Sequence, residues 1–275
     1  MEVTMLTSPE DPWVFANAKS VDDVNFQNWP ETVGLFMPCW NNRDVIEQTV
    51  QSLVAMPERY PFGLVAIDGG STDGTVECLT AAGVPVVSLA QPRKNLMNEM
   101  AELWLGKYDR LADMFSREDR VGYLGFVHTD ADYGVDPSWL SKLAAECWSD
   151  SKIGCVGPAY DDQTQALPEG LHVANCPIFV IPVPVIKALY RRHGWWIDPN
   201  YWSGTSYCDW DMQWHLKELG YLSVVSTWSR IRHFCQGTRA KLWVDEPDFR
   251  RRDDENRVYY HSKWPAGVSP FGGTT

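Results

Sequence analysis

Three aspartates follow apolar runs at two places in this sequence. In LVAIDGGSTDGTVECL (64–79), Asp68 ends an apolar run and is followed by glycines and hydroxyl residues. In HTDADY (128–133), Asp130 and Asp132 stand one residue apart after a second apolar run. Two carboxylates this close repel each other unless a cation or hydrogen-bond donors compensate. A hard divalent ion such as Mg²⁺ or Mn²⁺, which bridges carboxylates to substrate phosphates, would compensate. The alternative is a solvated turn before a helix.

Strands that alternate with helices are expected to position these aspartates. Apolar runs predict strands at 33–38, 62–68, 84–90, 121–130, 153–159 and 175–182, and helices are predicted at 43–56, 72–82, 94–118, 137–148 and 184–193. This alternation is typical of an α/β domain with a mainly parallel central sheet flanked by helices. Because ligands bind beyond the carboxyl ends of such strands, Asp68 is expected in a ligand crevice. Asp73 is placed to cap the helix that follows.

The composition indicates an α/β chain without a membrane span. With 275 residues, 44% of them hydrophobic, the chain can bury a substantial core. It has no apolar run of about 18 residues and no basic-then-apolar N-terminus, which predicts neither a membrane helix nor a signal peptide. The seven cysteines form no CxxC pair. Free thiols in a reducing cytosol are therefore expected, and with them a cytoplasmic location.

The charge is uneven along the chain. The net charge is −12, and the whole acidic excess lies in residues 1–137. An acidic surface disfavours non-specific binding of nucleic acid. Basic clusters at 191–193, 230–233 and 250–252 keep a phosphorylated or polyanionic partner open, although such clusters are usually solvated faces. Most of the fourteen tryptophans are expected to pack in or near the core, with Trp202 the first choice for a platform under a sugar or base.

Five segments in order resemble one enzyme family. They are PCWNN (38–42), IDGGSTDGT (67–75), PRKN (92–95), TDAD (129–132) and WWIDPNYWSGTSYCDWDMQWHLKELGY (195–221). Together they resemble the GT-A fold glycosyltransferases, especially the large inverting family 2. The resemblance implies a Rossmann-like GT-A domain at 31–237, with a nucleotide-sugar half at 31–135 and an acceptor half at 136–237. Residues 1–30 are expected to form an arm, and 238–275 a tail that packs on the domain as a lid, strap or oligomer contact.

The resemblance also implies roles for single residues on the donor side. Donor nucleotide contacts are expected from Pro38, Trp40, Asn41, Asp68, Arg93 and Asp130. The Mn²⁺ or Mg²⁺ ion is expected on Asp130, Asp132 and His233, with Asp132 nearest the diphosphate. The donor is expected to be a nucleoside diphosphate sugar, with UDP-sugar first. One departure concerns Gly69, which stands where the family often has a second acid. This departure leaves the identity of the donor's nucleobase open.

On the acceptor side, the resemblance implies that Asp209 is the general base, with Asp211 in reserve. Trp202 and Trp210 are expected to contact the acceptor. Cys208 stands where the family has an acid just before this base, so the acidic pair is only partly present. If Asp209 is not the base, a retaining mechanism becomes possible. Both aspartates would also complement the dipole of a helix that starts there.

The function predicted from these residues is metal-dependent transfer of a sugar to an acceptor hydroxyl, with inversion. The acceptor is a glycan, a lipid-linked sugar, a protein or a hydroxymethylated DNA base of the kind that some phage enzymes modify. Two alternatives stay open: a sugar nucleotidyltransferase and a non-catalytic module that binds nucleotide sugars. The nucleotidyltransferases usually have a Gly-rich, Arg-containing loop after the first strand, and PCWNNRD does not resemble one. The sequence names neither the sugar nor the oligomeric state.

Overall fold

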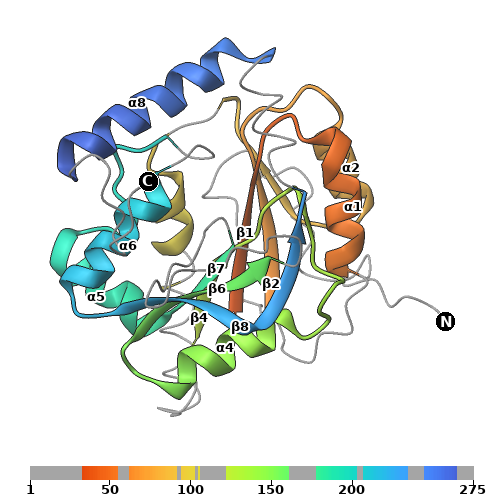
Figure 1. Cartoon of the computed structure of the whole chain (residues 1–275). Coiled ribbons are helices and arrows are strands. Elements are labelled where there is room, and N and C mark those ends of the chain that lie inside the picture. The colour runs from red at the N-terminus through yellow and green to blue at the C-terminus, as the bar shows by residue number, and fades with distance from the viewer. Residues whose placement is uncertain are drawn as a thin grey trace.

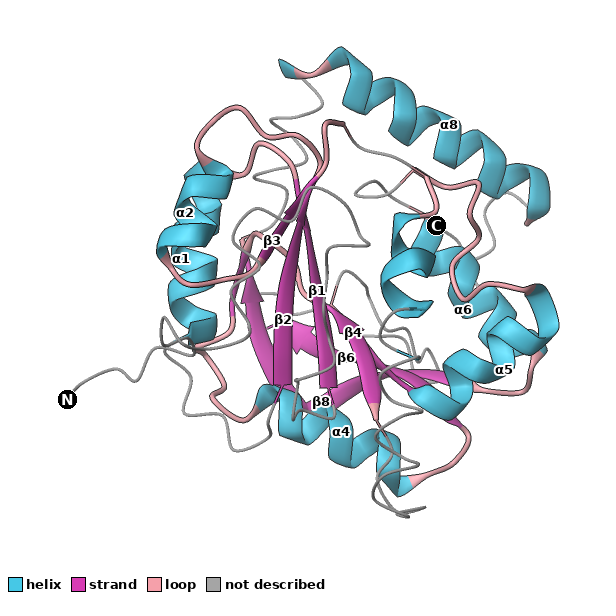
Figure 2. Ribbon diagram, turned by 180° about the vertical axis from the view of Figure 1, so that it is seen from behind, coloured by secondary structure: helices cyan, strands magenta, loops and turns pink. Residues whose placement is uncertain are grey.

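The described strands of the computed structural model form one sheet (Figures 1 and 2). The structure describes residues 33–54, 62–91, 94–102, 105, 122–160, 178–202, 207–234 and 245–264. The strands are β1 Val33–Cys39, β2 Phe62–Asp68, β3 Val86–Ser88, β4 Tyr123–Phe126, β5 Ala131–Asp132, β6 Ile153–Tyr160, β7 Phe179–Pro182 and β8 Leu222–His233. Their order across the sheet is β3-β2-β1-β4-β7-β6-β8-β5.

The sheet is mainly parallel, as predicted. Strand β1 pairs in parallel with β2 and β4, β2 with β3, and β6 with β8. The pairs β4–β7, β6–β7 and β5–β8 are antiparallel. Parallel pairing brings the carboxyl ends of β1, β2 and β4 to one edge, and the candidate site residues follow these ends.

Both faces of the sheet are buried, which explains the continuous apolar runs. In β1, Leu35 and Met37 belong to one core cluster, and Phe36 between them belongs to the other. Side chains alternate along a strand, so each strand serves both clusters. Figure 2 shows α1 and α2 on one side of the sheet and α5 and α6 on the other.

Helices cover both faces of the sheet, as predicted. The helices on the side of Leu35 are α1 Arg43–Val54, α2 Thr75–Ala81 and α4 Trp139–Ser149. Those on the side of Phe36 are α5 Val183–His193, α6 Cys208–Glu218 and the helical residues 96–102. In the predicted helix 94–118, residues 94 and 95 precede the helical residues, and 103–104 and 106–118 lie outside the described residues, as do the N-terminal arm and Arg93.

Part of the predicted tail is a helix, α8 Pro247–Lys263. Figure 1 shows it at the top of the molecule, above α6. Its sequence is polar, and the residues it buries are mostly charged or polar, including Arg252, Asp253 and Asn256. Its contacts are therefore mainly hydrogen bonds, ion pairs and ring contacts, described below.

Two further predictions can be compared with the described residues. Cys39, Cys78, Cys147, Cys155 and Cys208 are free thiols, as expected, whereas Cys176 and Cys235 lie outside the described part. Within that part, no helix is both long and apolar enough to cross a membrane. The boundaries proposed between the two halves of the domain stay a prediction.

Candidate functional site

The turn after β2 is held by two aspartates. Asp68 is buried, and its carboxylate accepts hydrogen bonds from the backbone N–H groups of Gly70 (3.1 Å) and Ser71 and from the Ser71 hydroxyl. Asp73 accepts hydrogen bonds from the backbone N–H of Arg43 (2.9 Å) and of Thr75 (3.0 Å), the first residues of α1 and α2. Asp73 therefore binds the first N–H group of two helices, although the N-cap position of α2 itself is Gly74, one residue after the predicted cap.

Gly70 shows why this turn needs glycine. Its φ is +91°, and a Cβ there would lie 2.7 Å from the carbonyl oxygen of Ala90. A side chain at this position would therefore be strained and would clash with backbone. The turn approaches the end of β3 this closely, which keeps the Asp68 carboxylate at the carboxyl edge of the sheet.

The segment after β1 is tied to the same turn. The backbone N–H of Asn41, a residue at a left-handed φ of 50°, donates to the Ser71 hydroxyl (2.8 Å), and its side-chain oxygen accepts from the N–H of Thr72 (2.9 Å). The PCWNN and GGSTD segments therefore form one polar wall. Pro38 lies within β1, and Trp40 is half-buried beside this wall.

The second aspartate cluster lies in a loop that α1 holds in place. Thr49 of α1 donates through its hydroxyl to the carbonyl of Thr129 (2.8 Å) and accepts from the N–H of Ala131 (3.1 Å). The buried Tyr133 hydroxyl accepts from the N–H of His128 (2.8 Å). Burial, opposed by this backbone hydrogen bond, raises the pKa of Tyr133 well above its usual value, so the phenol stays neutral.

The loop ends in a short strand that the sequence did not predict. The predicted fourth strand, 121–130, stops at Phe126, and Ala131–Asp132 form β5 instead. Strand β5 pairs with β8, with Ala131 opposite His233 and Asp132 opposite Arg232. His233 is the last residue of β8, rather than a residue after it. This pairing brings His233 to the aspartate loop from about 100 residues away in the chain.

His128, Asp130 and His233 form a compact group of metal-ligating side chains. Nδ1 of His128 lies 2.6 Å and Nε2 of His233 lies 3.1 Å from Oδ1 of Asp130. The ligand atoms of all three lie within 4.8 Å of one another. Burial opposes ionisation of Asp130, but hydrogen bonds from both imidazoles outweigh it and hold the Asp130 pKa well below its usual range. An anionic carboxylate between two imidazoles can hold a divalent cation.

The structure thus brings together two of the three predicted metal ligands and adds one. Asp132 is half-buried, and its Oδ1 accepts a hydrogen bond from the N–H of Gly134 (2.9 Å). His128 is the added member of the group of metal-ligating side chains. The sequence analysis missed His128, although a histidine two residues before an aspartate at a strand end was a usable signal.

Helix α8 reaches the donor side through Arg252. This buried guanidinium lies 5.4 Å from the ring centre of Trp40 and 5.1 Å from that of Trp202, and its Nη2 pairs with Asp248. Its Nε is buried without a hydrogen-bond partner. Glu246, just before α8, accepts a hydrogen bond from the side-chain amide of Asn41 (3.2 Å). This contact between the tail and the predicted donor-side residues was not predicted from the sequence.

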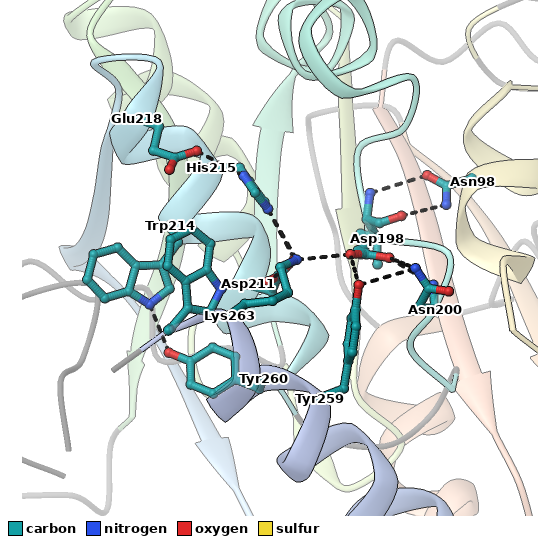
Figure 3. Close-up of polar contacts among 12 residues, drawn as sticks. Asn98, Asp198, Asn200, Asp211, Trp214, His215, Glu218, Tyr259, Tyr260 and Lys263 are labelled. Carbon is teal, nitrogen blue, oxygen red and sulfur yellow. Dashed lines mark hydrogen bonds and ion pairs between the residues drawn. The ribbon is translucent and has the colours of Figure 1, made fainter. Parts of the chain in front are cut away.

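On the acceptor side, Asp211 belongs to a buried network (Figure 3). Its Oδ1 accepts hydrogen bonds from Nζ of Lys263 (2.6 Å) and Nε1 of Trp264 (2.7 Å). The same ammonium lies 2.9 Å from Oδ2 of Asp198 and 3.5 Å from Nε2 of His215. Asp211 is fully buried and paired with a cation, which makes it a structural anchor for α8 rather than a group open to an acceptor.

The other residues predicted on the acceptor side lie on α6 or pack against α8. Asp209 lies in the first turn of α6 and is half-buried. Trp210 packs against Tyr207 and Tyr260 at ring-centre distances of 6.1 Å. The indole N–H of Trp202 donates to Glu255 of α8 (2.7 Å), and Nζ of Lys94 lies 5.2 Å from its ring centre. Trp196, by contrast, is a core residue that stacks on Phe126.

Comparisons with known proteins identify the fold. Residues 35–101 match the model of the family described as glycosyl transferase family 2. A mannosyltransferase from Pyrobaculum calidifontis, solved with GDP-Man and Mn²⁺, aligns with a TM-score of 0.56 and 15% identity over 86% of this chain and 65% of its own length. Glucosyl-3-phosphoglycerate synthase from Mycobacterium tuberculosis was solved with Mn²⁺, UDP and glucosyl-3-phosphoglycerate. It aligns with a TM-score of 0.51 and 14% identity over 90% of this chain and 86% of its own length. No curated protein matches the chain.

Proposed function

We propose that this chain, a glycosyltransferase of GT-A fold, transfers a sugar from a nucleoside diphosphate sugar to an acceptor hydroxyl with the help of a divalent cation. The observation that carries the proposal is the His128–Asp130–His233 group at the carboxyl edge of the sheet. Both structural neighbours were solved with Mn²⁺ and with a nucleotide or nucleotide sugar, GDP-Man in one and UDP in the other. We take UDP-sugars as the first donor class.

The ligand group fits Mn²⁺ better than Mg²⁺. Two imidazoles and one carboxylate favour transition ions, whereas Mg²⁺ prefers oxygen ligands alone. A cation bound there would neutralise the charge that builds on the diphosphate as the sugar leaves. Asp130 supplies the buried negative charge, and the two histidines fix its orientation. Asp132, half-buried two residues further on, is retained as a proposed ligand once the diphosphate is present.

The proposed base is Asp209, which accepts the proton of the attacking hydroxyl. Asp211, the reserve candidate, is fully buried and paired with Lys263, and a carboxylate so held is a poor proton acceptor for a substrate. A base on the acceptor side, distinct from the metal group on the donor side, suits attack opposite the leaving group. We therefore propose inversion at the sugar carbon.

The donor site is tested by calorimetric titration of UDP- and GDP-sugars with and without Mn²⁺. We expect one donor to bind the wild type in a Mn²⁺-dependent way. Asp130→Asn should weaken that binding by about 100-fold, because it removes the carboxylate of the ligand group. Asp150→Asn, an exposed aspartate after α4, is the matched control and should bind like the wild type. If no donor binds with or without Mn²⁺, the proposed function is wrong.

Arg252 is proposed to contact the donor nucleotide. A guanidinium stacks on aromatic rings and forms paired hydrogen bonds to phosphate, which an ammonium does not reproduce. We expect Arg252→Lys to raise the dissociation constant for the donor about 10-fold with little change in kcat, because a bidentate contact is lost. Arg257→Lys is the control, because Arg257 is an exposed arginine of α8 paired only locally with Asp254. Equal donor binding by both variants would contradict the assignment.

A further inference from the structure

A second group of metal-ligating side chains lies away from the donor side, on α5 and α6. His193 is the last residue of α5, and His215 and Glu218 lie one turn apart on α6. Their ligand atoms lie within 4.8 Å of one another, and the two imidazole ring centres are 4.3 Å apart. Nδ1 of His215 lies 3.1 Å from Oε2 of Glu218. Figure 3 shows the His215–Glu218 pair beside the Lys263 network.

Three buried polar atoms around this network make no hydrogen bond. They are Nε2 of His193, Oδ2 of Asp211 and the hydroxyl of Tyr201, which interacts electrostatically with Asp211. Buried polar atoms without a partner cost free energy, so each one needs a physical reason. The unpaired Nε2 of His193 is a nitrogen that a cation could bind.

The position of His215 gives a physical reason for the unpaired Oδ2 of Asp211. Nε2 of His215 lies 3.4 Å from Oδ2 of Asp211. If Nδ1 of His215 binds a cation, its proton sits on Nε2, which would then donate toward this oxygen instead of accepting from Nζ of Lys263, 3.5 Å away. Histidine ligands of metals usually donate their other N–H to a carboxylate in this way, which fixes the tautomer and the ring. A cation on Nδ1 would thus satisfy Asp211.

The charge of the surroundings also suits a cation. Three carboxylates, those of Asp198, Asp211 and Glu218, surround the single ammonium of Lys263 and the two histidines. Lys263 compensates one of these three negative charges, and Arg192 is a further cation close to His193. Asp198 and Asp211 are buried, so their charges are weakly screened.

We propose that His193, His215 and Glu218 form a second metal site that binds Zn²⁺ or a similar transition ion and is separate from the donor-side group. Two imidazoles and one carboxylate are a common zinc ligand set that leaves a fourth position for water. The site would join the end of α5 to α6. Through His215 it would also fix the position of Asp211, and so the anchor that holds α8.

The experiment separates this site from the donor-side group by removing the latter's imidazoles. The parent protein is the full chain with His128→Gln and His233→Gln, stripped of metal with a chelator and titrated with Zn²⁺ alone by calorimetry. We expect one Zn²⁺ per chain. Adding His193→Gln or Glu218→Gln should weaken binding by about 100-fold or more, because each removes a ligand. Binding by both variants with the parent's affinity would overturn the proposal.

Controls distinguish a loss of Zn²⁺ binding from a failure of the variant to fold. Glu218 is half exposed, so Glu218→Gln is expected to fold like the parent, as checked by circular dichroism. His261→Gln changes a histidine of α8 that packs against Tyr207 and Tyr260, outside both groups, and should leave Zn²⁺ binding unchanged. Zn²⁺ should raise the Tm of the parent and not that of the Glu218→Gln variant. Equal Tm gains in both would also overturn the proposal.

Discussion

Replacing Asp209 by asparagine is expected to lower kcat by about 10²–10⁴-fold, the usual contribution of a positioned general base. Donor affinity should stay at the wild-type value, because the proposed donor contacts lie on other elements. Asp209 lies in the first turn of α6, where its carboxylate is half-buried, and Trp210 next to it packs toward α8. The measurement is initial-rate kinetics with the donor found by calorimetry, together with calorimetric donor binding by the variant.

Asp211→Asn is the matched comparison, because it changes the neighbouring aspartate on the same helix. Its carboxylate is held by Lys263 and Trp264, so its loss should lower thermal stability more than Asp209→Asn does. Wild-type turnover in Asp209→Asn would show that Asp209 is not the base. The anomeric configuration of the product, read by NMR, then distinguishes inversion from a retaining mechanism that needs no such base.

The sequence predicted well those parts of the fold that depend on neighbouring residues. The buried strands β1 and β2 were visible as apolar runs, because both faces of a parallel sheet are covered. The turn after β2 was also predictable, because the left-handed φ of Gly70 and the hydrogen bond from the N–H of Thr75 to Asp73 are local features. Local chemistry of this kind needs no knowledge of distant segments.

The contacts that complete the candidate site join segments far apart in the chain. His233 meets Asp130 only because β5 pairs with β8, and a two-residue strand leaves no periodic pattern to detect. Arg252 meets Trp40 because α8 packs near the end of β1, and a polar helix gives no apolar stripe to orient it. The ligand group was therefore only partly predictable, and the anchoring of α8 was not.

The choice between Asp209 and Asp211 shows the same limit. Both stand in the first turn of α6, and the sequence favours either as a base or as a helix-dipole partner. The structure distinguishes them because Lys263, more than 50 residues further along the chain, pairs with Asp211, which is fully buried. A residue's role here depends on which side chain arrives from another element.

Lys263→Met is expected to destabilise the folded chain by about 3–5 kcal/mol, the usual effect of removing one partner from a buried ion pair. The ammonium lies 2.6 Å from Oδ1 of Asp211 and 2.9 Å from Oδ2 of Asp198, and both carboxylates are buried. Methionine keeps much of the side-chain volume, so the loss reflects charge rather than a cavity. Lys217→Met on α6 is the control, because Lys217 is exposed and should change stability by less than about 0.5 kcal/mol.

The pH dependence of the stability difference between wild type and Lys263→Met tests whether the lost charge causes that difference. Burial opposes the charged form of Lys263, but the carboxylates of Asp211 and Asp198 outweigh it and raise the Lys263 pKa above its usual value. A raised folded-state pKa means that the stabilisation is complete below the unfolded value of about 10.4 and is lost as pH rises through the folded-state pKa. Urea unfolding at several pH values should therefore show a constant gap between wild type and Lys263→Met near neutrality, narrowing above about pH 10.4. A gap that stays constant to high pH would assign the loss to packing against the rings of Tyr259 and Trp264 instead.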